Sequence, residues 1–445
     1  MEQILIERWN EKGHGRARFE GKTVDVKGAF LGETVLVDLK KGKRGTKKGI
    51  IHSIFSPSVE RVADRCSHSR ICGGCNFHGL SYPSQILLKQ EAVQKLFTHP
   101  VAPIIEAQEP FYYRNKMEFT FSEDKEKKRY LGLVQEDSRG KVFEQKDCAL
   151  CPEWMLGTLK NVYDHWCTTT IDAYYLHRNS GSLRTLTCRG GVNTKERMVI
   201  LGLSGNPSFA LTYEELEGFK QAILEANLDS PQISIFAVLT HVEKGTPTYT
   251  SEIHLHGKDH YTETLLKKTF LISPQAFFQP NPVQAERLYT TAFDLLQPAP
   301  EERVLDLYCG VGSIGICLKE RVKEVYGIEL NKYAVCDAMR NIAVNGLENI
   351  NVAVGDVKEV LLQHKDAPFD SVIVDPPRAG LDIEVIETLG AMQVKKLLYI
   401  SCNPKTLARD LPLLESKGYQ LEALQPVDQF PQTLHLEMIA FFVRK

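Results

Sequence analysis

The C-terminal part of the chain, residues 271–445, is predicted to form a doubly wound α/β domain, and two observations predict it. Short apolar runs with the length of buried strands alternate with segments of helical period. One run leads into a glycine-rich turn in Leu305–Ile316 (LDLYCGVGSIGI), and another ends at Cys402 in Leu397–Leu411 (LLYISCNPKTLARDL). Open α/β sheets place their chemistry at the carboxyl ends of their strands, where both features are expected to lie.

Length and composition are those of a globular protein with more than one domain. The chain has 445 residues, of which 43% are hydrophobic and 25% charged, so it is long enough for two or three cores. Its eleven cysteines, with no secretory signal and no long apolar span, predict a cytoplasmic protein that uses thiols as ligands or nucleophiles. The formal net charge of −2 gives no overall sign of a polyanionic partner, so nucleic-acid binding would depend on local patches.

One such patch lies near the N-terminus. Residues 1–50 contain twelve Lys or Arg against seven Asp or Glu, and Lys40–Lys48 (KKGKRGTKK) holds six of these cations. Alternating runs with glycine turns on both sides predict short strands, as in a five-stranded oligonucleotide-binding barrel. Residues 1–56 are therefore predicted to form a small oligonucleotide-binding barrel, although a basic loop that only faces solvent would have the same composition.

Five cysteines form two groups. Cys66, Cys72 and Cys75 lie within ten residues in CSHSRICGGC, and Cys148 and Cys151 come later in KDCALCPE. Spacing alone leaves two metal sites open. Cys72 and Cys75 with Cys148 and Cys151 would supply the four thiolates of a structural zinc site. Cys66, Cys72 and Cys75 with one later cysteine would instead hold a [4Fe–4S] cluster.

Residues 57–270 are predicted to form an α+β middle domain that carries this metal site. Strand-like runs alternate there with one clear helix over Tyr213–Ala226. A second helical segment, Tyr82–His99, belongs to residues 79–111, which we expect to pack on the C-terminal domain. A strand that begins at Tyr113–Lys116 (YRNK) carries cations suited to phosphate groups.

The glycine-rich turn in the C-terminal domain is typical of a site for a nucleotide-containing ligand. The glycines that let the backbone approach a ligand are Gly310, Gly312 and Gly315. Glu329 ends the next apolar run, where an acid would bind ribose hydroxyls, and this spacing fits S-adenosylmethionine as well as NAD. Two later features favour the methyl donor: Asp356 follows a third strand, and a D-P-P turn begins at Asp375 after a fourth.

Cys402 is a candidate nucleophile. It ends an apolar run, and the helix expected from Thr406 would bring its N-terminal dipole close to a thiolate. On its own the residue is better explained as a packed structural thiol, because free cysteine is among the most buried residue types. The neighbouring motifs change that balance.

Five motifs together resemble those of the RNA uracil-5-methyltransferases, and in particular the branch that modifies bacterial 23S ribosomal RNA. They occur in the family's order as FFQPN (277–281), DLYCGVGSIG (306–315), DPPRAGL (375–381), SCNP (401–404) and HLE (435–437). The resemblance covers nearly the whole chain. It implies a TRAM barrel at residues 1–56 and a [4Fe–4S] cluster whose fourth ligand is Cys148, with Cys151 and zinc as the alternatives.

The resemblance also assigns roles in transferring a methyl group from S-adenosylmethionine to carbon 5 of a uridine. Cys402 adds to carbon 6, Asp375 accepts the uracil N3–H, and Glu437 removes the proton from carbon 5. Without the resemblance, Glu437 would be interpreted as a charge on an edge strand. Gln279 is placed at the junction of the methyl donor and the uracil. The residues expected to contact the donor are Gln279, Tyr308, Gly310, Ser313, Glu329, Asp356 and Asp375.

Other interpretations differ at particular residues. One of Phe277 and Phe278 is expected to stack on the extruded base or on the adenine. An adenine amino-methyltransferase also has a D-P-P turn, but an aromatic residue normally follows it, and here Arg378 follows. A cytosine-5-methyltransferase usually carries its cysteine after proline. The expected protein is a monomeric enzyme that acts on 23S ribosomal RNA and has no membrane partner. Two alternatives stay open: a transfer-RNA uracil-5-methyltransferase and a catalytically silent RNA-binding factor.

Overall fold

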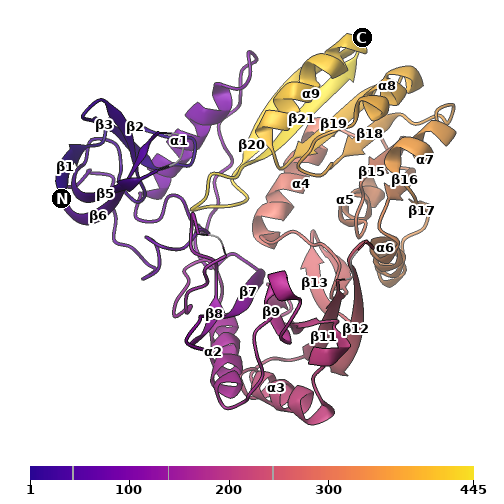
Figure 1. Ribbon diagram of the computed structural model, residues 1–445. Helices are drawn as coiled ribbons and strands as arrows, with labels where there is room; N and C mark the ends of the chain where they lie inside the picture. Colours follow the sequence, from indigo (N-terminus) through magenta and orange to yellow (C-terminus); the bar gives the residue numbers. More distant parts are fainter. Residues whose placement is uncertain (43–44, 139, 243–244) are drawn as a thin grey trace.

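The computed structural model describes residues 1–42, 45–138, 140–242 and 245–445. Figure 1 shows three large sheets along the chain, from the indigo N-terminal sheet through the magenta middle sheet to the orange and yellow C-terminal sheet. In the described ranges, none of the helices combines the length and the apolar character needed to cross a bilayer.

The N-terminal region forms a six-stranded sheet in the order β1-β5-β6-β4-β3-β2. Its strands are β1 (Glu2–Leu5), β2 (Arg8–Trp9), β3 (Gly15–Phe19), β4 (Lys22–Val26), β5 (Thr34–Lys41) and β6 (Lys47–Ser56). Inward-facing residues such as Ile4, Val24 and Val37 form its core. Three strands separate β1 from β3 in this order, yet the two lie against each other, so the sheet curls onto itself.

This sheet differs from the expected five-stranded barrel by the short extra strand β2. Lys40 and Lys41 of the predicted basic run end β5 with exposed side chains. Lys43 and Arg44 of that run lie outside the described residues. The assignment of this sheet as an RNA-binding domain stays a prediction.

Helix α1 (Tyr82–Gln94) ties the N-terminal half of the chain to the C-terminal sheet. It begins where the Ser81 side chain accepts the N–H of Ser84, and it ends at Gln94, before the end expected at His99. Ile86 on this helix, together with Phe97 and Ile104 beyond it, belongs to the hydrophobic core of the C-terminal domain.

The middle region forms a six-stranded sheet in the order β12-β11-β10-β9-β7-β8. Its elements are β7 (Lys116–Glu123), β8 (Arg129–Gly132), α2 (Glu153–Cys167), η1 (Leu176–Arg178), β9 (Leu183–Gly190), β10 (Arg197–Ser204), η2 (Pro207–Phe209), α3 (Tyr213–Glu225), β11 (Ile233–His241) and β12 (Tyr249–His256). Alternate residues of β10 point to opposite faces. Val199 and Leu201 pack with α2 and α3, whereas Met198 and Ile200 pack in the core of the C-terminal domain.

The C-terminal region contains a hairpin and a seven-stranded sheet in the order β17-β16-β15-β18-β19-β21-β20. The hairpin consists of β13 (Tyr261–Leu265) and β14 (Lys268–Ile272), and the helices are α4 (Pro282–Leu296), α5 (Ser313–Leu318), η3 (Lys319–Arg321), α6 (Lys332–Val344), α7 (Val357–Gln363), α8 (Ile383–Met392) and α9 (Pro404–Ser416). The strands are β15 (Arg303–Leu307), β16 (Glu324–Glu329), β17 (Ile350–Val354), β18 (Ser371–Val374), β19 (Lys396–Ser401), β20 (Tyr419–Val427) and β21 (Glu437–Arg444).

Strands β15 to β19 are parallel, which confirms the doubly wound α/β fold predicted for this region. The hairpin places Tyr261 and Phe270 in the same core as α4. Met198 and Ile200 of the middle sheet share this core, so core membership does not fix a boundary, and the one at residue 271 stays a prediction. The chain leaves β15 toward β16 on one side and reaches β18 on the other, so the strand order reverses between β15 and β18, where open sheets bind their ligands.

Candidate active site and cysteine-lined cavity

A cavity of about 820 Å³ lies at the carboxyl edge of the parallel strands. The predicted site residues that line it are Gln279, Tyr308, Gly310, Glu329, Asp356, Asp375, Cys402 and Glu437. Ser313, the first residue of α5, is not among the lining residues, and its hydroxyl lies 3.0 Å from the hydroxyl of Tyr289 on α4. The fold thus brings together eight residues from separate motifs in one cavity.

The glycine-rich turn after β15 has an unusual backbone. Tyr308 has a φ of +63° and Gly310 a φ of +55°, and only glycine adopts this left-handed region without strain. The turn brings the Gly310 N–H to within 3.0 Å of one Glu329 carboxylate oxygen, and the Asn331 N–H lies 2.7 Å from the other. Each oxygen keeps a further lone pair, so Glu329 is held in place and can still accept hydroxyl groups.

Asp356 follows β17 and caps α7. Its carboxylate accepts the N–H of Lys358 at 2.9 Å, and the side chain also lines the cavity. The predicted acid after the third strand is therefore fixed by the start of the next helix.

Three chemically reactive side chains come from three neighbouring strands. Asp375 follows the last residue of β18, Cys402 follows the last residue of β19, and Glu437 is the first residue of β21. β19 and β21 are antiparallel and pair Ser401 with Met438, so the end of one strand meets the start of the other. This register brings the thiol and both acids to one edge of the sheet.

The cavity suppresses ionisation of all three groups. Burial raises the pKa of Asp375 to about 7, and burial with the Asp375 charge raises the pKa of Glu437 to about 8. Burial, followed by the charges of Glu437 and Asp375, raises the pKa of Cys402 to about 11, while Arg378 acts in the opposite direction. At neutral pH the thiol of the ligand-free site is therefore protonated, and the two carboxyls retain protons that ordinary carboxyls would lose.

The segment that carries Gln279 is fixed from two sides. The Asn115 side-chain amide donates to the Gln279 carbonyl oxygen at 3.0 Å, and the Gln429 amide donates to the Gln279 side-chain oxygen at 3.3 Å. Phe278 is 4% exposed and lies 5.5 Å from Phe270, between ring centroids. Phe277 is 69% exposed and lines the cavity, so it is the ring that a flat ligand can reach.

Sequence reasoning missed the residues that hold the loop before Glu437. Lys89 on α1 forms a buried ion pair of 2.5 Å with Asp428, and its ammonium also donates to the carbonyls of Phe430 and His435, each at 3.1 Å. These residues are 339 or more positions from Lys89, and no local pattern connects them. Gln429 was missed for the same reason. Asn115, the other residue that holds Gln279, lies in the YRNK motif, which the sequence analysis did identify.

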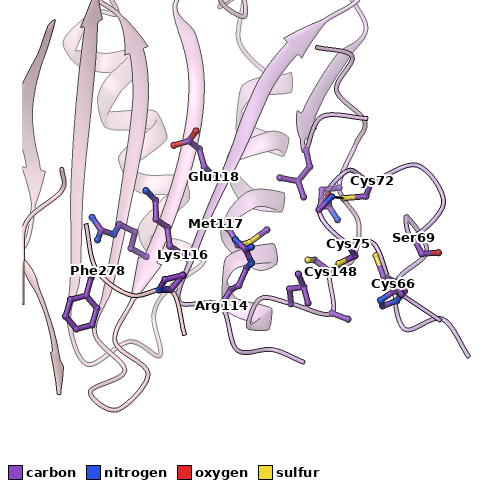
Figure 2. Close-up of a pocket in the computed structure, with 18 of the residues that line it drawn as sticks. Cys66, Ser69, Cys72, Cys75, Arg114, Lys116, Met117, Glu118, Cys148 and Phe278 are labelled. Carbon is purple, nitrogen blue, oxygen red and sulfur yellow. Dashed lines mark hydrogen bonds between the residues drawn. The ribbon is translucent and has the colours of Figure 1, made fainter. Parts of the chain in front are cut away.

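A second cavity, of about 440 Å³, contains the predicted metal ligands. Cys66, Cys72, Cys75 and Cys148 all line it, and Figure 2 shows them gathered at one end. The loop that bears the first three cysteines is joined to the segment before Cys148 by several bonds. The Glu136 N–H donates to the Ile71 carbonyl at 3.0 Å, the Lys146 N–H to the His68 ring at 3.0 Å, and the Ser67 N–H to the Asp147 carboxylate at 3.0 Å.

The five candidate ligands differ in their surroundings. Cys151 is fully buried in the core of the middle sheet and is absent from the cavity lining. A hydrogen bond from its thiol lowers the pKa of Cys148, whereas burial raises the pKa of Cys66 to about 12. Burial and then the three other cavity thiols raise the pKa of Cys75. In the described part of the chain, no three His, Cys, Asp or Glu side chains are grouped closely enough to hold a metal ion.

Comparisons with known proteins agree with the geometry of the first cavity. Residues 258–445 match the family model described as tRNA (uracil-5-)-methyltransferase. An RNA methyltransferase of Protochlamydia amoebophila is 40% identical, over 94% of this chain and 99% of the relative. The chain belongs to the RNA uracil-5-methyltransferase family. Enzymes of this family use S-adenosylmethionine, as the glycine-rich turn and its following acids predicted.

Another RNA methyltransferase and one solved structure are similar over nearly the full length. An RNA methyltransferase of Caldanaerobacter subterraneus is 33% identical, over 98% of this chain and 97% of the relative. The crystal structure of the tRNA (uracil-54, C5)-methyltransferase of Pyrococcus abyssi, in complex with S-adenosyl-L-homocysteine, matches with a TM-score of 0.79 and 25% identity. That match covers 99% of both chains.

Proposed function

We propose that this protein transfers the methyl group of S-adenosylmethionine to carbon 5 of a uridine in 23S ribosomal RNA, through a covalent bond between Cys402 and carbon 6. The observation that carries the proposal is the meeting of Cys402, Asp375 and Glu437 at the wall of the cavity that begins at the glycine-rich turn. S-Adenosylmethionine, when bound, supplies an electrophilic methyl group. Carbon 5 of uracil needs the help of a nucleophile before it can attack that group.

Each of the three residues has a step that suits its position. Cys402 gives its proton to solvent, its sulfur then bonds to carbon 6, and the electrons of the double bond between carbon 5 and carbon 6 move onto O4, which makes carbon 5 nucleophilic. After methyl transfer, Glu437 takes the remaining proton from carbon 5, and the bond from carbon 6 to sulfur breaks to return the thiolate. A base with a pKa near the working pH is suited to this transfer, and that of Glu437 is about 8.

Asp375 is suited to distinguish uracil from cytosine. Its carboxylate would accept the uracil N3–H, whereas cytosine presents an unprotonated nitrogen at the same place. Gln279 lies in the same cavity with its side chain held by Gln429, so it can contact both the donor and the base.

The RNA target is supported by motif details and has one rival. The five motifs together resemble the ribosomal branch, and the N-terminal sheet presents Lys40 and Lys41 to solvent. This sheet does not discriminate by itself, since the Pyrococcus abyssi enzyme, which acts on tRNA, aligns with 99% of the chain. A uridine in tRNA is therefore the second candidate substrate.

The target is tested by mass mapping of ribosomal and transfer RNA from cells that lack the protein. We expect one or more 5-methyluridines to disappear from 23S ribosomal RNA, and purified protein to restore them with labelled S-adenosylmethionine. Loss from transfer RNA alone would assign the protein to the second candidate, and no loss from either RNA would contradict uridine methylation.

We also propose that Cys66, Cys72, Cys75 and Cys148 hold a [4Fe–4S] cluster. The four thiols line one cavity, as the ligands of one cluster must. The exclusion of Cys151 from the cavity supports Cys148 as the fourth ligand. The cluster would tie the cysteine loop to the segment before Cys148, and methyl transfer needs no electrons from it.

Protein purified without oxygen should be brown and contain iron and sulfide. Cys148→Ser should lose most of the iron, and the matched variant Cys151→Ser should keep it, because only the first thiol faces the cavity. Stoichiometric zinc without iron would contradict the cluster. Loss of iron from Cys151→Ser alone would contradict the choice of Cys148.

A further inference from the structure

The cysteine-lined cavity has a second end that carries positive charge. Lys116 and Arg189 line it there, together with Ala276 and Phe278. Figure 2 shows Lys116 and Phe278 at the end opposite to the labelled cysteines. The proposed cluster explains the thiols, but it leaves this cationic end unexplained.

Lys116 and Arg189 face each other from adjacent strands. They are direct partners in the antiparallel register of β7 and β9. Burial, and after it the Arg189 charge, lowers the pKa of Lys116, and Glu118, which also lines the cavity, acts in the opposite direction. Like charges opposite each other destabilise a sheet, so this pair is best accommodated when an anion lies between them.

The guanidinium of Arg189 is built into the protein and has a donor to spare. The residue is only 2% exposed, and one terminal nitrogen donates to the carbonyls of Ser273 at 3.2 Å and Pro274 at 2.9 Å. Its Nε–H is buried and has no hydrogen-bond partner among the residues that the structure describes. The Nε–H of Arg114, which also lines this cavity, is in the same state. Buried donors are nearly always satisfied, so unpaired ones indicate a ligand.

Lys116 and Arg189 do not act mainly on the cysteine thiols. Arg114 is the cation that lowers the pKa of Cys75 and Cys148, and neither Lys116 nor Arg189 is among the main influences on those thiols. Arg114, Phe277 and Pro280 line both this cavity and the active-site cavity. An anion held by Lys116 and Arg189 would therefore lie beside a strand whose uracil occupies the active site.

We propose that Lys116 and Arg189 bind one phosphodiester group of the RNA substrate, close to the target nucleotide. A phosphate matches a guanidinium and an ammonium that converge from two strands, and such contacts fix the register of a nucleic acid on a protein. The proposal rests on the proposed function, because it takes the anion to be part of the RNA that is methylated.

The first test is the salt dependence of RNA binding by anaerobically purified Lys116→Gln protein in a Cys402→Ala background, where no adduct forms. The slope of log affinity against log salt should fall by roughly 0.7 when one phosphate contact is lost from a single strand. Lys323→Gln is the matched control, since Lys323 is exposed and precedes β16 at the amino edge of the sheet, opposite to the active site. The probes are a nine-residue oligouridylate and the RNA fragment that accepts methyl label.

The second test removes the charge from the RNA. Methylphosphonate is placed at one linkage at a time around the target uridine, and affinity is measured for wild-type and Lys116→Gln protein. At one linkage the substitution should weaken wild-type binding several-fold and leave Lys116→Gln binding unchanged. Arg189→Lys, which keeps the charge and loses the second donor, should show an intermediate loss at the same linkage.

Three outcomes would overturn the proposal. The first is equal salt slopes for Lys116→Gln and Lys323→Gln. The second is that the losses of affinity caused by Lys116→Gln and by methylphosphonate are additive at every linkage. The third is loss of iron from Lys116→Gln with unchanged RNA affinity, which would assign the cation to the cluster. Failure of the proposed function is distinguishable. If no uridine is methylated, the oligouridylate slope should still fall, because phosphate contacts do not depend on sequence.

Discussion

At the scale of single residues, the cavity of the proposed active site holds Cys402, Asp375 and Glu437 where each resists ionisation. Burial raises the pKa of all three groups, and the charges of neighbouring acids raise those of Cys402 and Glu437 further. Such groups are unfavourable for folding at high pH and useful for proton transfer near neutrality. Both consequences can be measured.

Glu437→Gln should permit addition and methyl transfer but stall before elimination. The amide cannot take the proton from carbon 5, so a covalent adduct of protein and RNA should accumulate. The adduct should survive denaturing electrophoresis, require S-adenosylmethionine and carry label from its methyl group. Turnover should fall by about two to four orders of magnitude, the usual contribution of one positioned base.

The controls for this experiment are Cys402→Ala and the double variant. Neither should form an adduct, because no thiol is present to add to carbon 6. Normal turnover of Glu437→Gln without adduct would show that another group is the base. Glu437, the first residue of β21, would then be a buried acid with no catalytic role.

The same two acids should make the protein less stable as the pH rises. Asp375 and Glu437 keep protons in the folded state up to pH values of about 7 and 8, whereas the unfolded chain releases them above about 4. Their contribution to stability is present below the unfolded pKa and is lost as the pH rises through the folded pKa. A difference of one pH unit between the folded and unfolded pKa of a group corresponds to about 1.4 kcal/mol, so several kcal/mol is the upper bound.

The measurement is the unfolding free energy of the ligand-free protein at pH 5 and pH 9. Glu437→Gln has no proton to release at this position, so it should lose less stability than wild type between these values and be the more stable of the two at pH 9. An equal loss in both proteins would show that Glu437 ionises normally.

At the scale of elements, the loop over residues 428–436 connects the reactive residues to a helix far away in sequence. Lys89 on α1 holds this loop through Asp428 and two carbonyl groups, and Tyr82 on the same helix donates its hydroxyl to Asp428 at 2.9 Å. Glu437 follows this loop directly, so α1 helps to set the position of the proposed base.

Lys89→Met should destabilise the fold by about 3–5 kcal/mol, because it leaves the Asp428 charge buried without its partner. The matched control is Lys160→Met, which breaks an exposed ion pair of 2.5 Å with Asp164 and should change stability by about 1 kcal/mol or less. The measurement is urea unfolding of both variants. The double variant Lys89→Met/Asp428→Leu should recover stability. Equal effects of Lys89→Met and Lys160→Met would contradict a structural role for the buried pair.

Local patterns predicted the reactive elements better than the contacts between them. The strand that ends at Cys402 and the glycine-rich turn were readable, because burial and turn chemistry leave period and composition signals. The choice between Phe277 and Phe278 was not readable, since both are aromatic and only packing against Phe270 decides which is buried. The pair of Lys89 and Asp428 was invisible for a similar reason, because an ion pair across 339 positions leaves no local pattern.

At the scale of the whole molecule, the N-terminal sheet is joined to the middle region by specific contacts. Lys27 forms an ion pair of 2.5 Å with Glu136, His14 lies 3.1 Å from the same carboxylate, and Phe30 packs with Phe77. Removing residues 1–55 would therefore expose Phe77 and leave Glu136 unpaired, so the deletion would disturb the cysteine loop as well as any RNA contact.

A sharper test of RNA binding by this sheet uses Lys40→Gln/Lys41→Gln. Both side chains are exposed at the end of β5, whereas Lys47 and Lys48 are engaged with Glu20 and Asp137. If Lys40 and Lys41 each displace a counterion, the salt slope of RNA affinity should fall by roughly 0.7 to 0.9 for each contact, with no change in the unfolding free energy.

The matched control for that variant is Lys323→Gln/Lys395→Gln, which removes two charges at the amino edge of the C-terminal sheet, beside β16 and β19. Its salt slope should equal that of wild type, because this edge faces away from the active-site cavity at the carboxyl ends of the strands. Equal slopes for both double variants would show that the basic end of β5 only faces solvent. The contacts of this sheet with Glu136 and Phe77 would then make it a brace for the cysteine loop.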